Sequence, residues 1–186
     1  EKIPPHLPRV EEGLLEFPLM IVDKTKAHAA VFKPNFAYFE ILGASGMEVL
    51  QELIRKITPE IPVIGDAKRG DVGHSSQMYA KAVFETFGCG AVTVTPYQGE
   101  DALRPFFDYP ERGVFVLCLT SNPGAADFQL PELHLQVAKK VRAWNVTGNA
   151  GLVVGATRPE NIAAVRKISG QMPFLIPGVG AQGGDL

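Results

Sequence analysis

The chain has 186 residues, of which 46% are hydrophobic, which is enough for one domain with a sizeable core. Its net charge of -2 comes from interspersed acids and bases, so we expect no nucleic acid partner and no polybasic membrane patch. The apolar runs are too short for a membrane helix, and the two cysteines lie in apolar segments, which together predict a cytoplasmic protein with reduced thiols.

Short apolar runs alternate about six times with longer amphipathic segments. A loop or linker is predicted over 1–12, and a helix over 14–29 follows it. The predicted strands are, in chain order, 30–36, 62–66, 91–95, 114–119, 151–155 and 174–177. The predicted helices between them are 41–57, 75–87, 101–107, 133–144 and 159–168.

Strict alternation of strand and helix predicts parallel βα units, which build either an open doubly wound sheet or a closed barrel. Polar residues follow nearly every predicted strand, and sites assembled from many strand ends are typical of barrels. Six strands are two fewer than a barrel needs, and the first predicted element is a helix. We therefore expect an α/β fold, a (β/α)8 TIM barrel over 13–186 that lacks its first and last strands.

The densest cluster of charges lies at the end of the second predicted strand. Asp66 and Lys68 are two residues apart, so in a regular strand they share a face. Together with Asp71, Asp66 would favour the ammonium form of Lys68, which makes this lysine a candidate proton donor. The alternative is a solvated turn with surface ion pairs. We favour a functional site, because unpaired charges within or at the end of a buried strand cost folding free energy.

Lys33 follows the preceding predicted strand, and neighbouring strands lie about 4.8 Å apart. It would therefore lie close to Asp66 and extend the cluster to an alternating array of two lysines and two acids. The equally good alternative is that Lys33 extends into solvent.

A glycine-rich segment follows the last predicted strand. Its members Pro177, Gly178, Gly180, Gln182 and Gly183 suit a loop whose backbone amides close around a phosphate. The same glycines form a G-x-G-x-x-G pattern, but a dinucleotide fingerprint belongs in a first βα turn, so a sugar phosphate is the better ligand.

Two further features carry less information by themselves. The turn at 120–124 offers hydroxyl and amide groups that could bind a polar heterocycle, yet it also reads simply as a good turn. The four histidines are isolated in the sequence, so a metal site has little support.

Taken together, these segments resemble the orotidine 5'-phosphate decarboxylase family, specifically its type 2 subgroup. The segments that carry the resemblance are Lys33–Asn35 with Phe39–Glu40, Asp66–Asp71, Thr93–Tyr97, Thr120–Gly124, Val153–Thr157 and Ile176–Asp185. Six motifs in order along nearly the whole chain make the resemblance specific.

The resemblance implies a homodimeric barrel that converts orotidine 5'-phosphate to uridine 5'-phosphate and carbon dioxide without metal or organic cofactor. By the same carry-over, Asp66 faces the departing carboxylate, Lys68 protonates the ring carbon and Lys33 orients Asp66. Asp71 and Ser75 reach the partner subunit's site. The residues expected to contact substrate are Asn35, Ser75, Ser121, Pro177, Gly178, Gly180, Gln182 and Gly183, with Ser121 at the pyrimidine edge and Gln182 at the phosphate.

Two family motifs are absent from this chain: an Asp-containing motif on the first strand and a Ser-Arg motif near the last, whose arginine grips the phosphate. The alternatives are a related metal-dependent sugar-phosphate decarboxylase or aldolase, and a noncatalytic phosphate-binding fragment.

Overall fold

The computed structural model describes residues 11–180 and 183–184, apart from the side chains of Glu11 and Glu12. Most of the predicted linker lies outside this part of the chain. The helices are α1 (Glu11–Thr25), η1 (Lys26–His28, 3-10), α2 (Ala37–Glu40), α3 (Gly43–Ile57), α4 (Gly73–Lys81), η2 (Ala82–Thr86, π), α5 (Glu100–Phe107), α6 (Ala125–Phe128), α7 (Leu133–Trp144) and α8 (Pro159–Ser169). The strands are β1 (Ile64–Arg69), β2 (Ala91–Val94), β3 (Gly113–Leu119), β4 (Ala150–Val154) and β5 (Phe174–Leu175).

The strands form one sheet in the order β1-β2-β3-β4-β5, which is also their order along the chain. The pairs β3–β4 and β4–β5 are parallel. A parallel sheet in sequential order, with a helix after each of its first four strands, is what repeated βα units produce. The predicted alternation is therefore confirmed for these strands.

The chain divides into two compact units, and β1 and β2 contribute residues to both. The described part of unit 1 covers 11–67 and 78–92, and that of unit 2 covers 68–77, 93–180 and 183–184. The division places Asp66 in unit 1 and Lys68 in unit 2.

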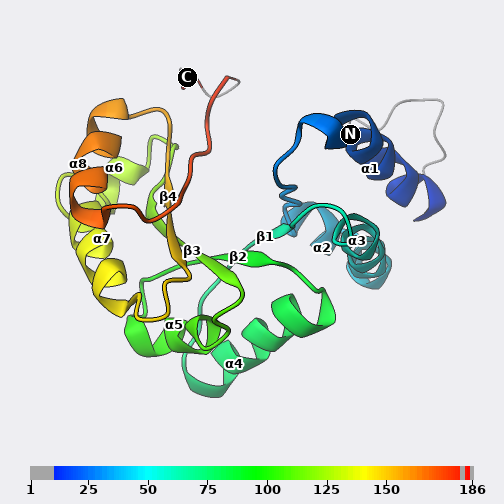
Figure 1. Cartoon of the computed structure of the whole chain (residues 1–186), viewed down its shortest axis with the longest axis horizontal. Helices are drawn as coiled ribbons and strands as arrows, with labels where there is room; N and C mark the ends of the chain where they lie inside the picture. The colour runs from blue at the N-terminus through cyan, green and yellow to red at the C-terminus, as the bar shows by residue number, and fades with distance from the viewer. Residues whose placement is uncertain (1–10, 181–182, 185–186) are drawn as a thin grey trace. The chain divides into compact units, whose positions relative to one another are not determined.

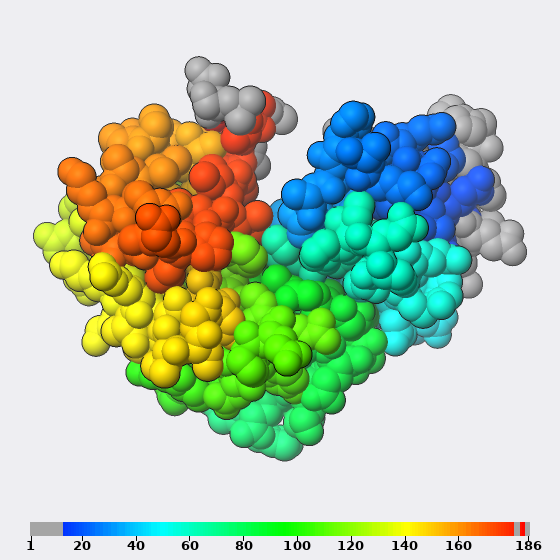
Figure 2. Space-filling model, in the orientation of Figure 1, coloured from blue at the N-terminus to red at the C-terminus, as the bar shows by residue number. Residues whose placement is uncertain are grey.

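In unit 1 the amphipathic helix α3 packs beside α1, which Figure 2 shows as cyan beside blue. Its buried residues recur at helical spacing and form one apolar stripe: Val49, Leu50, Leu53, Ile54 and Ile57. The remaining core of this unit includes Phe36, whose ring meets that of Phe87 edge to face, and the fully buried Val63.

In unit 2, the core is built on β3 and β4, whose residues Val116 and Leu152 pair in register and are fully buried. Helices α7 and α8 pack side by side, and α7 also contacts both strands (Figure 1). Burial of β4 along its whole length explains why its sequence is apolar throughout instead of alternating.

The first predicted strand, 30–36, is not a continuous strand in the structure. The backbone of this segment forms two isolated parallel bridges. Phe32 pairs with Val63, directly before β1, and Asn35 pairs with Asp66 within β1. The physical reason is Pro34, which has no N–H to donate at the position between the bridges. The segment still follows the edge of β1, because the Asp66 N–H donates to the Pro34 carbonyl at 3.0 Å.

The helix predicted over 41–57 is confirmed as α3, which begins two residues later, and α2 precedes it as a short helix that was not predicted. The structure has two helices, α2 and α3, and Gly43 at the start of α3 has a φ of +68°, which ends the regular path between them. Within the described residues, no helix is long and apolar enough to cross a membrane.

Candidate active site

The best-defined charged pair of the predicted cluster is in unit 1. The Lys33 Nζ lies 2.6 Å from the Asp66 Oδ2, with the side chains 33% and 8% exposed respectively. The isolated bridge between Asn35 and Asp66 brings the two segments together at this point. The predicted proximity of Lys33 and Asp66 is therefore confirmed, and the almost fully buried carboxylate is held in one place by an ammonium group.

Lys68 has an unusual backbone. Its φ is +46°, and among the described residues every other positive φ belongs to a glycine. A lysine in this left-handed region is strained, and such strain is concentrated at functional sites. The rule that alternate residues share a face assumes extended backbone, so the shared face of Asp66 and Lys68 stays a prediction.

Thr93 helps to hold this strained backbone. Its side chain is 1% exposed, and its Oγ1 accepts the N–H of Lys68 at 3.0 Å. Gly70 is required on the same stretch, because a Cβ at this position would collide with the Thr95 side chain. The sequence signal for Thr93 is a single hydroxyl inside an apolar strand, and sequence reasoning gave it no role.

The remaining predicted residues of this region form local contacts. The Asp71 Oδ1 accepts the neighbouring N–H of Val72 at 2.7 Å, and Ser75 is exposed on α4. The Asn35 Oδ1 accepts the N–H of Ala37 at 3.1 Å, where α2 begins. Asn35 therefore supports a helix start in this structure, and its contact with substrate stays a prediction.

Ser121 lies in unit 2 at the turn after β3. Its carbonyl oxygen accepts the Thr157 hydroxyl at 3.1 Å. Gly155 leaves room for it, since a Cβ there would lie 2.8 Å from the Ser121 backbone. Two segments that carry the family resemblance, 120–124 and 153–157, are thus in direct contact.

The glycine-rich loop is closed on itself. The N–H groups of Gly180, Gly183 and Gly184 donate to the carbonyls of Gly184, Gly180 and Gly178 at 2.8–3.0 Å. These three amides cannot donate to a phosphate at the same time, which corrects the expectation that the loop amides are open. Left-handed φ values at Gly178, Gly180 and Gly183 explain why the loop needs glycine there. Gln182 lies outside the described residues.

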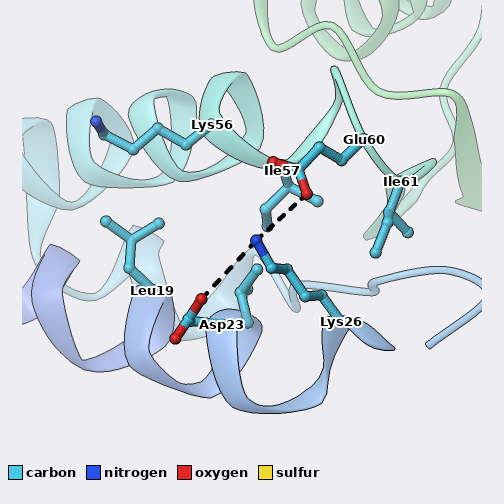
Figure 3. A pocket seen from close by; sticks show the side chains of 8 residues that line it. Leu19, Asp23, Lys26, Lys56, Ile57, Glu60 and Ile61 are labelled. Atoms are coloured by element: carbon cyan, nitrogen blue, oxygen red, sulfur yellow. Dashed lines mark hydrogen bonds and ion pairs between the residues drawn. The ribbon is translucent and has the colours of Figure 1, made fainter. Parts of the chain in front are cut away.

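Two cavities among the described residues offer alternative places for a ligand. One, of about 250 Å³, lies between α1 and α3, and there the Lys26 ammonium is 3.8 Å from Asp23 and 3.4 Å from Glu60 (Figure 3). Its other lysine, Lys56, pairs with Glu52. Because both ammonium groups are already matched by carboxylates, this cavity is a poor anion site.

The other cavity, in unit 2, has about 550 Å³ and is mainly apolar, with Leu117, Phe128 and Val137 among its lining residues. Thr120 and Gln129 are polar members of the wall. Over the described ranges, no three side chains of His, Cys, Asp or Glu gather as they would to hold a metal ion.

Comparison with known proteins identifies the family. The family model described as orotidine 5'-phosphate decarboxylase / HUMPS matches residues 15–186. The chain belongs to this family. An orotidine 5'-phosphate decarboxylase from Roseiflexus sp. (strain RS-1) is 49% identical over 192 residues, which cover 100% of this chain and 70% of that protein.

Solved structures are also similar to this chain. UMP synthase of Leishmania donovani superposes with a TM-score of 0.92 at 43% identity, over 96% of this chain and 41% of that chain. OMP decarboxylase of Leishmania donovani superposes with a TM-score of 0.89 at 42% identity, over 92% of this chain and 72% of that chain. The chain is thus an enzyme of the carboxy-lyase class and carries part of a (β/α)8 barrel.

Proposed function

We propose that this chain forms the catalytic part of an orotidine 5'-phosphate decarboxylase of the type 2 subgroup, which converts orotidylate to uridylate in pyrimidine biosynthesis. The observation that carries the proposal is the buried Asp66 carboxylate, fixed by the Lys33 ammonium at 2.6 Å and followed two residues later by Lys68. The names of the relatives support the same reaction.

In the proposed reaction, the bond between the substrate carboxylate and C6 of the pyrimidine breaks, and carbon dioxide leaves. The electron pair stays on C6, and Lys68 donates the proton that replaces the carboxylate. Asp66 faces the departing carboxylate, whose negative charge it disfavours, while Lys33 keeps Asp66 ionised and oriented. Charges that are fixed in advance need no reorganisation as the carbanion forms, which is how such a site lowers the barrier.

Substrate binding is assigned to the other predicted residues. Ser121 recognises the pyrimidine edge, Asn35 and Lys33 lie near the ribose, and the loop at Pro177–Gly183 with Gln182 binds the phosphate. Because the amides of this loop donate internally in the present form, we expect the loop to rearrange when phosphate binds. Phosphate binding remote from C6 then supplies energy for closure.

The proposed assembly is a homodimer with shared sites, in which Asp71 and Ser75 reach the partner subunit. The exposed position of Ser75 is compatible with such a contact. The proposed step consumes no oxidant, metal or organic cofactor. Cytoplasmic location stays a prediction from composition.

The test is the ultraviolet absorbance decay of orotidylate. It uses this chain and a completed chain, in which the rest of the Roseiflexus relative is joined to it. We expect the completed chain to turn over substrate and Lys68→Ala to lose about a thousandfold in kcat, as removal of a proton donor implies. Lys139→Ala, which removes an exposed lysine from α7, is the matched control and should retain activity.

No decay from a folded completed chain would refute the proposal. Metal-dependent cleavage of a sugar phosphate by the same protein would then point to the other reaction considered above.

A further inference from the structure

We propose that Gln129 is a positioning residue that holds the turn carrying Ser121 in place for recognition of the pyrimidine. The inference rests on the proposed function and adds to it a residue that neither the charge cluster nor the glycine loop contains. Gln129 follows α6 in unit 2, eight positions after Ser121 in the sequence.

The Gln129 side chain binds the residue directly before Ser121 through two atoms. Its Oε1 accepts the Thr120 N–H at 2.7 Å, and its Nε2 donates to the Thr120 Oγ1 at 2.9 Å. The Thr120 hydroxyl in turn donates to the Asn122 Oδ1 at 2.6 Å. A primary amide satisfies a backbone donor and a side-chain oxygen at once, so this turn is fixed at the residues on both sides of Ser121.

The base of the Gln129 side chain is fixed as well. Its N–H donates to the Ala125 carbonyl at 2.9 Å, and its carbonyl accepts the backbone N–H of His134 at 3.0 Å. The same carbonyl lies 2.9 Å from the His134 Nδ1, which must carry the proton because a carbonyl oxygen only accepts. Because His134 is buried in α7, Gln129 connects the turn to that helix.

The other side of Ser121 is held by β4 and the residues after it. Thr157 donates to the Ser121 carbonyl at 3.1 Å, and Gly155 lies against the Ser121 backbone. Ser121 therefore has two supports, one from Gly155 and Thr157 and one from Gln129 through Thr120. Loss of this support would leave the partly buried Thr120 N–H without its acceptor and would let the Ser121 hydroxyl move. A small displacement of a group that contacts substrate is enough to lower affinity and rate.

The test compares two ligands by calorimetry on the completed chain. Uridine 5'-phosphate contains the pyrimidine, whereas ribose 5-phosphate has the sugar and phosphate alone. Gln129→Met should weaken uridine 5'-phosphate binding about tenfold, as loss of one buried hydrogen-bonded support implies, and leave ribose 5-phosphate affinity within about twofold. Gln129→Glu keeps the acceptor for Thr120 and should restore most of the affinity. The matched control is Gln136→Met, an exposed glutamine on α7, which should change neither affinity.

Equal loss of both ligands, or no loss of uridine 5'-phosphate affinity, would overturn the inference. If Gln129→Met does not fold, Gln129→Asn is read in the same way, because its amide is one methylene too short to reach Thr120. Failure of the proposed function looks different: the parent completed chain would then neither bind uridine 5'-phosphate nor decarboxylate orotidylate.

Discussion

Lys68 combines a chemical role with a strained backbone, and the two can be separated by mutation. Its φ of +46° disfavours any residue with a Cβ, so Lys68→Ala keeps the strain and Lys68→Gly relieves it. We predict that Lys68→Gly is more stable than Lys68→Ala by about 1 kcal/mol in urea unfolding, while both variants lose about a thousandfold in kcat. Equal stability of the two would show that the left-handed conformation is not maintained in solution.

Burial of Cys118 should make the stability of the fold depend on pH in the alkaline range. Removal from water raises the pKa of the Cys118 thiol from 9.0 to about 12, although a hydrogen bond with the Ala138 backbone acts in the opposite direction. The folded state therefore holds the proton more tightly than the unfolded state. The resulting stability is complete below pH 9 and is lost as the pH rises towards about 12.

Urea unfolding of the parent chain and of Cys118→Ala over this pH window measures the effect. The parent should lose stability more steeply than the variant, and its native thiols should resist alkylation near neutral pH because both cysteines are buried. Parallel curves for the two proteins would contradict the prediction.

Contacts between distant residues could be predicted from the sequence only where the two residues follow strands that are neighbours in the sheet. Lys33 and Asp66 follow neighbouring segments, so their approach could be inferred from the spacing of strands. Thr93 and Gln129 could not be found this way, because their partners Lys68 and Thr120 are bound through side-chain hydrogen bonds that no periodic pattern encodes. The prediction that the loop amides are open was wrong for a related reason. Glycine allows a phosphate-binding loop and an internally hydrogen-bonded turn equally well, so the sequence does not distinguish them.

At the scale of elements, α2 and α3 pack so closely that Gly46 has no space for a side chain. A Cβ at Gly46 would overlap the Phe39 carbonyl oxygen and the Leu42 Cβ. In most helices glycine to alanine is stabilising by about 1 kcal/mol, yet here we predict that Gly46→Ala is destabilising by about 1–3 kcal/mol.

Chemical denaturation measures this difference, with Glu48→Ala as the control on the exposed side of the same helix. Increased stability of Gly46→Ala would mean that α2 is not packed as described.

Element type was predicted well where periodicity is strong and poorly where one residue decides the backbone. Strands β2, β3 and β4 lie within one residue of their predicted bounds at either end. The strand predicted over 30–36 is not continuous, because Pro34 removes one hydrogen bond of the ladder. Helix α6 was not predicted, because four residues are too few to show a helical period.

At the scale of the whole molecule, the comparisons support the predicted barrel, and the shared dimer site stays a prediction. If Asp71 completes the partner's site, a mixture of completed chains carrying Lys68→Ala and Asp71→Ala contains heterodimers with one intact site. Random pairing predicts recovery of about a quarter of the parental activity after subunit exchange. Exchange without any recovery would place Lys68 and Asp71 in the same subunit's site, and full activity of Asp71→Ala by itself would remove Asp71 from the site.

The most direct test of the central claim follows a carboxyl-labelled orotidylate, with carbon-13 in the departing group, by nuclear magnetic resonance in heavy water. The completed chain should release the label as carbon dioxide and bicarbonate and should form uridylate deuterated at C6, while Lys68→Ala should release the label about a thousandfold more slowly. Retention of the label in orotidylate by the folded completed chain, or equal release by Lys68→Ala, would contradict the assignment of the reaction to Lys68.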